Sequence, residues 1–243
     1  MYRKRYKRKA PARRSYSYKN TRKIVRSEIK KNDNKDHPLM WTDYNTDFNG
    51  DYVKTTPTLV SIGKVLKDYI SANAFIKDQF VARVDPTGLG NYREGTIVLT
   101  GISYQLRFQQ NTSASNPGCN TFRHLLYSYL NTYDEDSEAI LNGGDIDQAP
   151  KTQYVRSMMW DKMGYLKAAI TESTTDNDEF VPGQRIYKGF KKLNHKFEFL
   201  LIESSGAWSW KQNDVRFEMA SDDNSAVGEI QVYGFMRIYF RVI

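Results

Sequence analysis

The chain has 243 residues and a formal net charge of +8, with 36 Lys and Arg against 28 Asp and Glu. Its single cysteine, Cys119, excludes an internal disulfide framework and a multi-cysteine zinc site within one chain. No apolar run approaches the length of a membrane helix, and no apolar stretch follows the charged N-terminus, so we predict neither a membrane span nor a secretory signal.

The first 31 residues concentrate the positive charge. They contain fourteen Lys and Arg and one acid, Glu28, so this segment carries +13 and the rest of the chain carries 8 − 13 = −5. Between Met1 and Lys23 there is no Leu, Ile, Val or Phe, and like charges at this density repel one another. We therefore predict a disordered basic arm over residues 1–36, followed by a folded domain over residues 37–243.

The arm has the composition of a nucleic-acid-binding segment. Its tyrosines alternate with basic residues, so rings can stack on unpaired bases while Lys and Arg meet phosphates, which favours single strands. The residues predicted to bind nucleic acid are Arg3, Lys4, Arg5, Tyr6, Lys7, Arg8, Lys9, Arg13, Arg14, Tyr16, Tyr18, Lys19, Arg22, Lys23 and Arg26. Six of them, Arg3, Lys4, Arg5, Lys7, Arg8 and Lys9, also fit a nuclear import signal. The alternative is a solvated charge run that serves only for import.

After the arm, a single segment shows helical spacing and eight segments favour strands. The helix is predicted over 59–70, where apolar residues recur every three or four positions. The predicted strands are 96–109, 125–130, 157–160, 165–170, 186–190, 197–202, 215–220 and a last strand of about fifteen residues that runs to the chain end. Polar segments at 131–150 and 171–183 are predicted as long loops. The pattern has no alternating βαβ units and favours an all-β fold.

Two of these strands have a clear period of two. Ile102, Tyr104, Leu106 and Phe108 are predicted to face a core, with Ser103, Gln105 and Arg107 facing outward. In the last strand the even positions from Ile230 to Val242 are apolar, and Gly234 is predicted to mark a bulge. We predict a single eight-stranded jelly roll of two antiparallel sheets, with long loops, one short helix and the disordered arm.

This layout resembles the capsid proteins of small circular single-stranded DNA viruses. The likeness rests on the short Arg/Lys/Tyr-rich arm, the body of about two hundred residues, and the closing segment GEIQVYGFMRIYFRVI, which is similar to the last strand of circovirus and geminivirus capsid proteins. The arm mixes Lys and Arg where circovirus arms are richer in Arg. Cys119 and three histidines cannot supply the Cys/His cluster of geminivirus capsids, so a divergent virus is indicated.

The resemblance implies a self-assembling homo-oligomer that forms an icosahedral (T=1) shell of sixty copies around single-stranded DNA. It also implies a host nuclear import receptor as partner, and the virion and the host nucleus as locations. Two alternatives stay open: a cellular β-sandwich nucleic-acid-binding module, and a jelly-roll capsid protein of a small RNA virus. Phosphate contacts do not report the sugar, so RNA would serve the arm as well as DNA.

The sequence shows no metalloprotease, hydrolase or P-loop signature, so we predict no enzyme activity and no catalytic, cofactor-binding or metal residues. His124 is predicted to be a satisfied core or interface histidine, and His195 a turn or strand-edge residue. Packing is the preferred role for Trp41, Trp160, Trp208, Trp210 and Phe217, although in a shell an exposed Trp would suit a subunit contact. Three acidic clusters could bind Ca²⁺ but are interpreted as solvated loops: Asp134, Glu135, Asp136 and Glu138; Asp176, Asp178 and Glu179; Asp222 and Asp223.

Overall fold

The computed structural model describes residues 37–84, 91–111, 119–130, 139–141, 146–151, 153, 155–167, 169–171, 179–181, 183–202, 207–211, 213–222 and 230–243. The predicted arm, residues 1–36, lies outside them. The unit Leu39–Ile243 contains every element described below.

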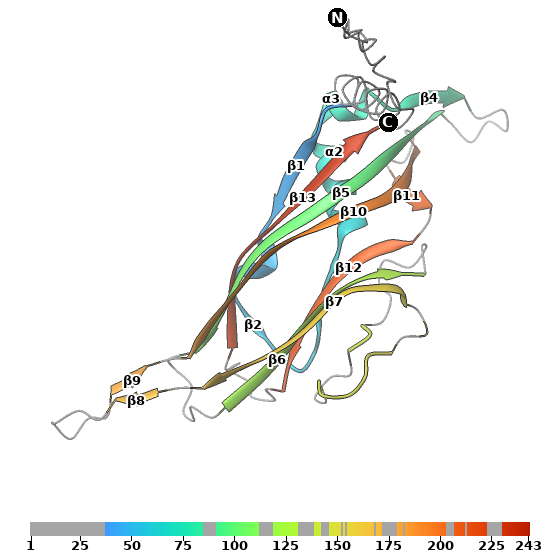
Figure 1. The fold of residues 1–243 in the computed structure, drawn as a ribbon. Coiled ribbons are helices and arrows are strands. Elements are labelled where there is room, and N and C mark those ends of the chain that lie inside the picture. Colours follow the sequence, from blue (N-terminus) through green and yellow to red (C-terminus); the bar gives the residue numbers. More distant parts are fainter. Residues whose placement is uncertain are drawn as a thin grey trace, which may run out of the picture. The chain divides into compact units, whose positions relative to one another are not determined.

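Two antiparallel sheets form the body of the protein (Figure 1). The seven-stranded sheet runs through β1 (Met40–Tyr44), β13 (Ile230–Val242), β5 (Asn91–Gln110), β10 (Gln184–Ile202) and β11 (Ala207–Lys211), with β2 (Asn49–Val53) beside β13 and β4 (Val81–Val84) beside β5. The four-stranded sheet runs through β3 (Thr58–Ser61), β12 (Asp214–Ser221), β6 (Cys119–Tyr129) and β7 (Val155–Lys167). A separate hairpin joins β8 (Ala169–Thr171) to β9 (Glu179–Val181).

Eight of these strands follow the path of a jelly roll. In chain order β1, β3, β5, β6, β7, β10, β12 and β13 pair first with last, second with seventh, third with sixth and fourth with fifth, all antiparallel. This is one long hairpin wound into two facing sheets, β1-β13-β5-β10 and β3-β12-β6-β7. The predicted fold class is therefore confirmed.

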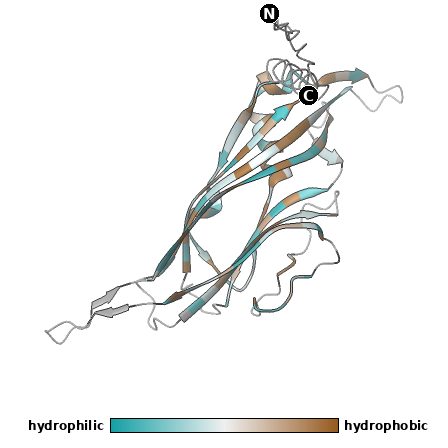
Figure 2. Ribbon diagram, viewed as in Figure 1, coloured by the Kyte–Doolittle hydropathy of each residue, from teal (hydrophilic) through white to brown (hydrophobic). Residues whose placement is uncertain are grey.

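The core lies between the inward faces of the two sheets. Alternate residues of β13 and β5 are buried, as the period of two predicts, and Figure 2 shows hydrophobic and hydrophilic residues alternating along both strands. The Phe108 ring of one sheet stacks on the Phe122 ring of the other with centroids 4.1 Å apart. Helix α2 (Ile62–Ala72) adds Ile62, Leu66 and Ile70, all fully buried. A fully buried side chain of this kind stabilises the fold by about 1.5–3 kcal/mol.

Gly234 permits a close approach of β13 to β5. Its φ is 140°, and a Cβ atom there would lie 1.9 Å from the carbonyl oxygen of Gln105. A side chain is excluded on both counts. The register with β2 shifts between Val232 and Tyr233, directly before this glycine, so the predicted bulge is found here.

The strand count differs from the prediction. The two main sheets contain eleven strands within the described residues, not eight. Segments 157–160 and 165–170 were predicted apart, yet β7 runs unbroken to Lys167, because Asp161 pairs with Arg123 on β6 and Lys162 donates to the Tyr104 hydroxyl on β5. Likewise 186–190 and 197–202 belong to one strand, β10. The polar residues between them include a bulge, where the register with β5 shifts between Lys192 and His195.

The helix prediction was also imprecise. Leu59 lies in β3, and α2 begins only after Ser61, whose hydroxyl accepts the Lys64 N–H at 3.0 Å as an N-cap. A second α-helix, α3 (Ala74–Lys77), follows, and η1 (Thr46–Phe48) is a 3₁₀ turn. Neither α-helix has the length and apolar content that a bilayer span would require.

Candidate functional site

The residues predicted to bind nucleic acid or an import receptor, all between Arg3 and Arg26, lie outside the described residues, so their placement stays a prediction. The site described here is instead on the body. It occupies the outer side of the seven-stranded sheet, where the residues between the buried positions of β1, β13, β5 and β10 point away from the core.

Aromatic and basic side chains gather on this side in neighbouring register rows. Trp41 of β1 lies opposite Tyr239 of β13, which lies opposite Gly101 of β5, which lies opposite Lys192 of β10. The next rows place Arg237 beside Asp43 and Ser103, and Ser103 beside Phe190. We call this surface the aromatic–basic face and define it by Trp41, Tyr233, Phe235, Tyr239, Phe190, Arg107, Lys188, Lys192 and Arg237.

Two of its rings are exposed to solvent. Phe190 is 61% exposed and Trp41 is 51% exposed. The Phe190 and Tyr239 rings meet edge to face, with centroids 5.8 Å apart. Gly101 leaves room for this arrangement, because a Cβ atom there would lie 2.6 Å from Cζ of Phe190. The face therefore presents apolar ring surface, whereas the sequence predicted packing as the first role of Trp41 and a subunit contact only if it were exposed.

Arg237 joins a ring to an acid. Its guanidinium lies 4.2 Å from the centroid of the Trp41 ring and donates two hydrogen bonds to Asp43, at 2.7 and 2.8 Å. The paired carboxylate raises the pKa of Arg237 further above its ordinary value. On the same face the Arg107 guanidinium lies 4.8 Å from the centroid of Tyr233. Such cation–π contacts hold the rings in place without hiding them.

A shallow groove continues this face between β13, β5 and β10. It is lined by Gln105, Arg107, Ile186, Tyr233, Gly234 and Phe235. Tyr233 and Phe235 flank Gly234, which has no side chain to fill the space between them. Arg107 brings a positive charge to the same groove.

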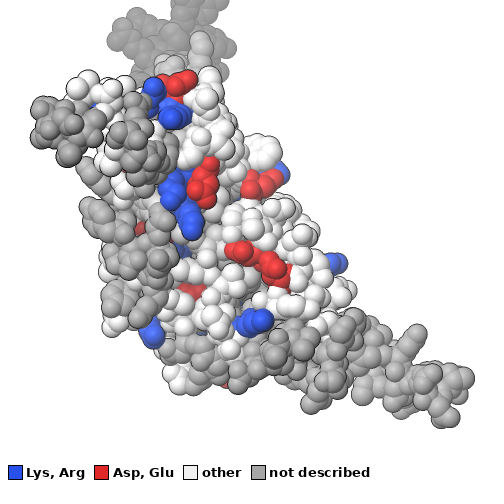
Figure 3. Space-filling model, turned by 180° about the vertical axis from the view of Figure 1, so that it is seen from behind, with Lys and Arg blue, Asp and Glu red and all other residues white. Residues whose placement is uncertain are grey.

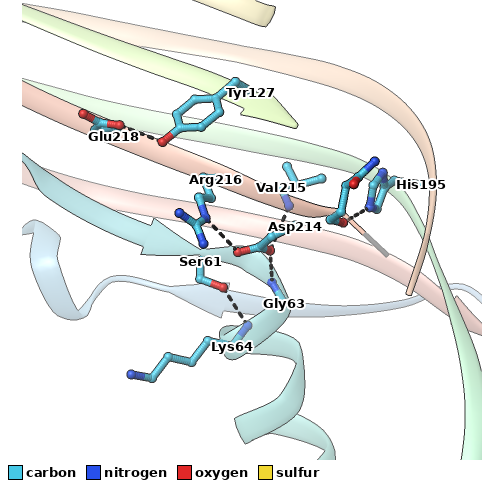
Figure 4. Close-up of polar contacts among 10 residues, drawn as sticks. Ser61, Gly63, Lys64, Tyr127, His195, Asp214, Val215, Arg216 and Glu218 are labelled. Atoms are coloured by element: carbon cyan, nitrogen blue, oxygen red, sulfur yellow. Dashed lines mark hydrogen bonds and ion pairs between the residues drawn. The ribbon is translucent and has the colours of Figure 1, made fainter. Parts of the chain in front are cut away.

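Buried polar side chains of the body stabilise the fold. Asp214 and Arg216 on β12 form an ion pair at 3.2 Å with side chains only 1% and 2% exposed. Oδ1 of Asp214 accepts the N–H groups of Gly63 at 3.0 Å and Val215 at 2.8 Å, and so ties the first turn of α2 to the sheet (Figure 4). Burial raises the pKa of Asp214 above its usual value.

Glu218, also on β12, holds two residues of the predicted loop 131–150. Its carboxylate accepts the Tyr127 hydroxyl at 2.7 Å and the N–H groups of Ile140 at 3.1 Å and Leu141 at 2.7 Å. Burial raises its pKa too. Arg123 acts similarly on 146–148, donating to the carbonyls of Ile146 and Gln148 while it pairs with Asp161 at 2.6 Å. These groups are committed to the fold.

The two histidines differ from their predictions. His124 is in the core, as predicted. Neither of its ring nitrogens has a hydrogen-bond partner among the described residues, so the prediction of a hydrogen-bonded histidine was wrong. Aromatic rings surround it, including Tyr187 at 4.9 Å and Phe108 at 5.6 Å between centroids. Burial, with Lys162 nearby, lowers its pKa to about 3. His195 lies inside β10, at the bulge, with Nε2 2.5 Å from the Asn213 carbonyl oxygen.

The other predicted sites have mixed outcomes. Trp210 and Phe217 are buried and Trp160 packs against the core, as predicted, whereas Trp41 is exposed. The Trp208 side chain lies outside the described residues. So do Asp134, Glu135, Asp136, Glu138, Asp176, Asp178, Asp223 and the Glu179 side chain. Asp222 accepts the Thr121 N–H at 2.9 Å. Within the described ranges no three acidic, His or Cys side chains are grouped to hold a metal ion.

Charge on the body is locally balanced on the side opposite the view of Figure 1. Figure 3 shows blue and red side chains lying next to one another there, without a continuous basic field among the described residues.

The aromatic–basic face was not predicted, although the sequence contains a signal for it. Tyr233, Phe235 and Tyr239 occupy the odd positions of the closing strand together with Arg237 and Arg241.

Comparison with known proteins adds little. No protein-family model matches the sequence, and no curated protein matches it. Among solved structures, the chain has 10% identity and a TM-score of 0.16 to a mutant VP2 protein of infectious bursal disease virus, from derived T=1 particles. That alignment covers 85% of this chain and 40% of the other. The chain thus matches less than half of that protein's length. A TM-score this low does not show that the two proteins share a fold or a function.

Proposed function

We propose that the chain is a viral capsid protein that self-assembles into a closed icosahedral shell, of sixty copies, and packages single-stranded DNA through its basic arm. The observation that carries the proposal is a jelly-roll body on a chain whose excess positive charge lies in the first 31 residues. Jelly rolls recur in capsid and lectin domains and in cupins, and a fold alone does not decide function. The arm's +13 charge favours the capsid.

The same proposal assigns the remaining roles. Arg3, Lys4, Arg5, Lys7, Arg8 and Lys9 would direct import into the host nucleus, and the wider set from Arg3 to Arg26 would neutralise the genome through counterion release. An extended arm of 31 residues reaches on the order of 100 Å, enough to cross a shell wall. The protein would have no catalytic role. A cellular nucleic-acid-binding module and an RNA-packaging capsid are the alternatives.

Electron microscopy of the purified full-length protein tests the proposal, with nuclease-resistant nucleic acid typed in the same fractions. We expect uniform closed particles that protect single-stranded DNA. Protected RNA would favour the RNA-virus alternative. Monomers or small oligomers at all salt concentrations, with single-stranded DNA added, would contradict the capsid and favour the cellular module.

A further inference from the structure

The aromatic–basic face has the chemistry of a stacking platform. Its exposed rings, Phe190 and Trp41, lie on adjacent register rows and are bridged by Tyr239, which contacts the Phe190 ring and lies opposite Trp41. Proteins that bind single strands without sequence preference combine such rings with a positively charged surface that follows the backbone. Tyr239 and Phe190 lie on the inner strands β13 and β10, and Trp41 lies on β1 at the edge of the sheet, where its ring contacts the Arg237 guanidinium. The positions of the rings are therefore set by the sheet before any ligand binds.

The charge of the face fits a polyanion. In the four register rows that contain Trp41, Asp43, Gln105 and Arg107, the sole acid is Asp43, and Arg237 already neutralises it. Arg107, Lys188 and Lys192 lie in these rows and form no ion pair with a described residue. Arg107 on β5 contacts the Tyr233 ring, and Lys188 and Lys192 lie on either side of Phe190 on β10, so phosphates could meet cations while bases meet rings.

A second copy of the chain fits this face less well. Protein–protein interfaces are enriched in aromatic residues and Arg, which this face has, but they are depleted in Lys. Lys188 and Lys192 lie on either side of Phe190, the most exposed ring of the face, on its own strand. The groove beside Tyr233 and Phe235 is lined by these two rings and Ile186, and Arg107 adds a positive charge to it. Lysine and arginine beside open rings are what an unpaired nucleic-acid strand requires.

We propose that the aromatic–basic face binds unpaired nucleic-acid bases by stacking, with Arg107, Lys188 and Lys192 contacting the phosphates. This inference rests on the proposed packaging function, and it extends that function from the arm to the folded body. Phe190, Tyr239 and Trp41 stack the bases, and the groove at Tyr233 and Phe235 continues the track. Sequence preference is not expected, because every base has a π-face.

The test uses full-length protein and three probes of equal length: oligo(dT), an abasic phosphodiester chain, and a double helix. Phe190→Ala and Trp41→Ala should each weaken oligo(dT) binding by about tenfold, as loss of one stacked base predicts, and leave binding of the abasic chain within about twofold. Phe75→Ala, which removes a 72% exposed ring from α3, is the matched control and should change neither. Lys188→Gln should weaken oligo(dT) and the abasic chain alike.

Photocross-linking of iodouracil-substituted oligo(dT) to the wild-type protein separates the body from the arm. We expect cross-linked peptides that contain Phe190, Trp41 or Tyr239. Cross-links confined to arm tyrosines, or an unchanged oligo(dT) affinity in both variants, would overturn the inference while leaving the packaging proposal intact. Loss of particles without loss of oligo(dT) affinity would assign the face to a subunit contact and overturn it as well.

Discussion

His124 shows how a single buried residue can set the acid sensitivity of the fold. Its imidazole lies among the Phe108, Tyr187 and Phe217 rings, without a hydrogen-bond partner in the described part of the chain. A charged imidazolium there would be poorly solvated, so the folded state holds the ring neutral and its pKa falls to about 3. The unfolded chain takes up the same proton near its ordinary value of about 6.5.

The sign of the resulting pH dependence follows directly. Between pH 6.5 and 3 the unfolded state binds one more proton at His124 than the folded state, so the free energy of unfolding falls as the pH falls. We expect His124→Phe, which removes this proton site, to lower the slope of unfolding free energy against pH by about 1.4 kcal/mol per unit below pH 6. Urea unfolding of dissociated full-length protein at several pH values measures it.

His124→Leu provides a second variant in case the larger ring disturbs the packing. Both variants should show the same reduction in slope, since both lack the titrating group. Slopes that run parallel to the wild type from pH 6 to pH 4 would show that His124 is protonated in the folded protein.

Asp214 links three elements, so its loss should lower the stability of all three. It joins β12 to the first turn of α2 through Gly63 and pairs with Arg216, whose guanidinium also lies 3.8 Å from the centroid of Tyr129 on β6. We expect Asp214→Ala to destabilise the chain by about 3–5 kcal/mol, because it leaves a buried cation without its carboxylate. Urea unfolding gives the magnitude, and faster amide exchange at Gly63 would locate the effect at α2.

Asp78→Ala is the matched control for this change. Asp78 pairs with Arg93 at 3.3 Å, but its side chain is 72% exposed. Its loss should cost less than about 1 kcal/mol. Equal effects of the two substitutions would contradict a structural role for the buried pair.

Local patterning predicted the long strands well and the short ones poorly. The alternating apolar residues of β5 and β13 identified both strands and their buried faces. β1 and β3 have only five and four residues, and two strands of the jelly roll were therefore missed. β7 and β10 were each divided in two, because their polar interruptions are stabilised by partners on other strands that the sequence does not reveal.

The aromatic–basic face shows the same limit for the candidate site. Trp41 and Tyr239 are 198 positions apart along the chain and become neighbours only through the pairing of β1 with β13. Periodicity shows that odd positions of the last strand point outward, but it cannot show which strands lie beside it. The arm differs, because charge density alone predicts its role and its site residues remain a prediction.

At the scale of the whole chain, the charge is divided between an arm at +13 and a body at −5. Binding of nucleic acid through the arm should therefore depend on salt through the arm's cations. Replacing Arg3, Lys4 and Arg5 with Gln should reduce the slope of log affinity against log salt for single-stranded DNA by about 2, at about 0.7 per phosphate contact. Titrations of full-length protein between about 50 and 200 mM salt measure this slope.

The control neutralises the same number of charges on the body. Lys54, Lys64 and Lys151 are exposed and lie outside the aromatic–basic face, so their replacement with Gln should leave the slope nearly unchanged. Equal reductions in the two triple variants would show that total charge, and not the arm, determines binding.

The nested pairing of the jelly roll also fixes an order in which the body can be completed as it is synthesised. β6 and β7 are adjacent in the chain and can pair as soon as both have been synthesised. β1 can pair only with β13, which follows nearly two hundred residues later. Pairings between such distant segments form slowly, because the entropy cost of closing the long loop comes before the contacts that stabilise the pair. The seven-stranded sheet, which contains the pair Trp41 and Tyr239, is therefore complete only after β13 has been synthesised. If bases stack on this face, they can do so only once the domain is fully folded.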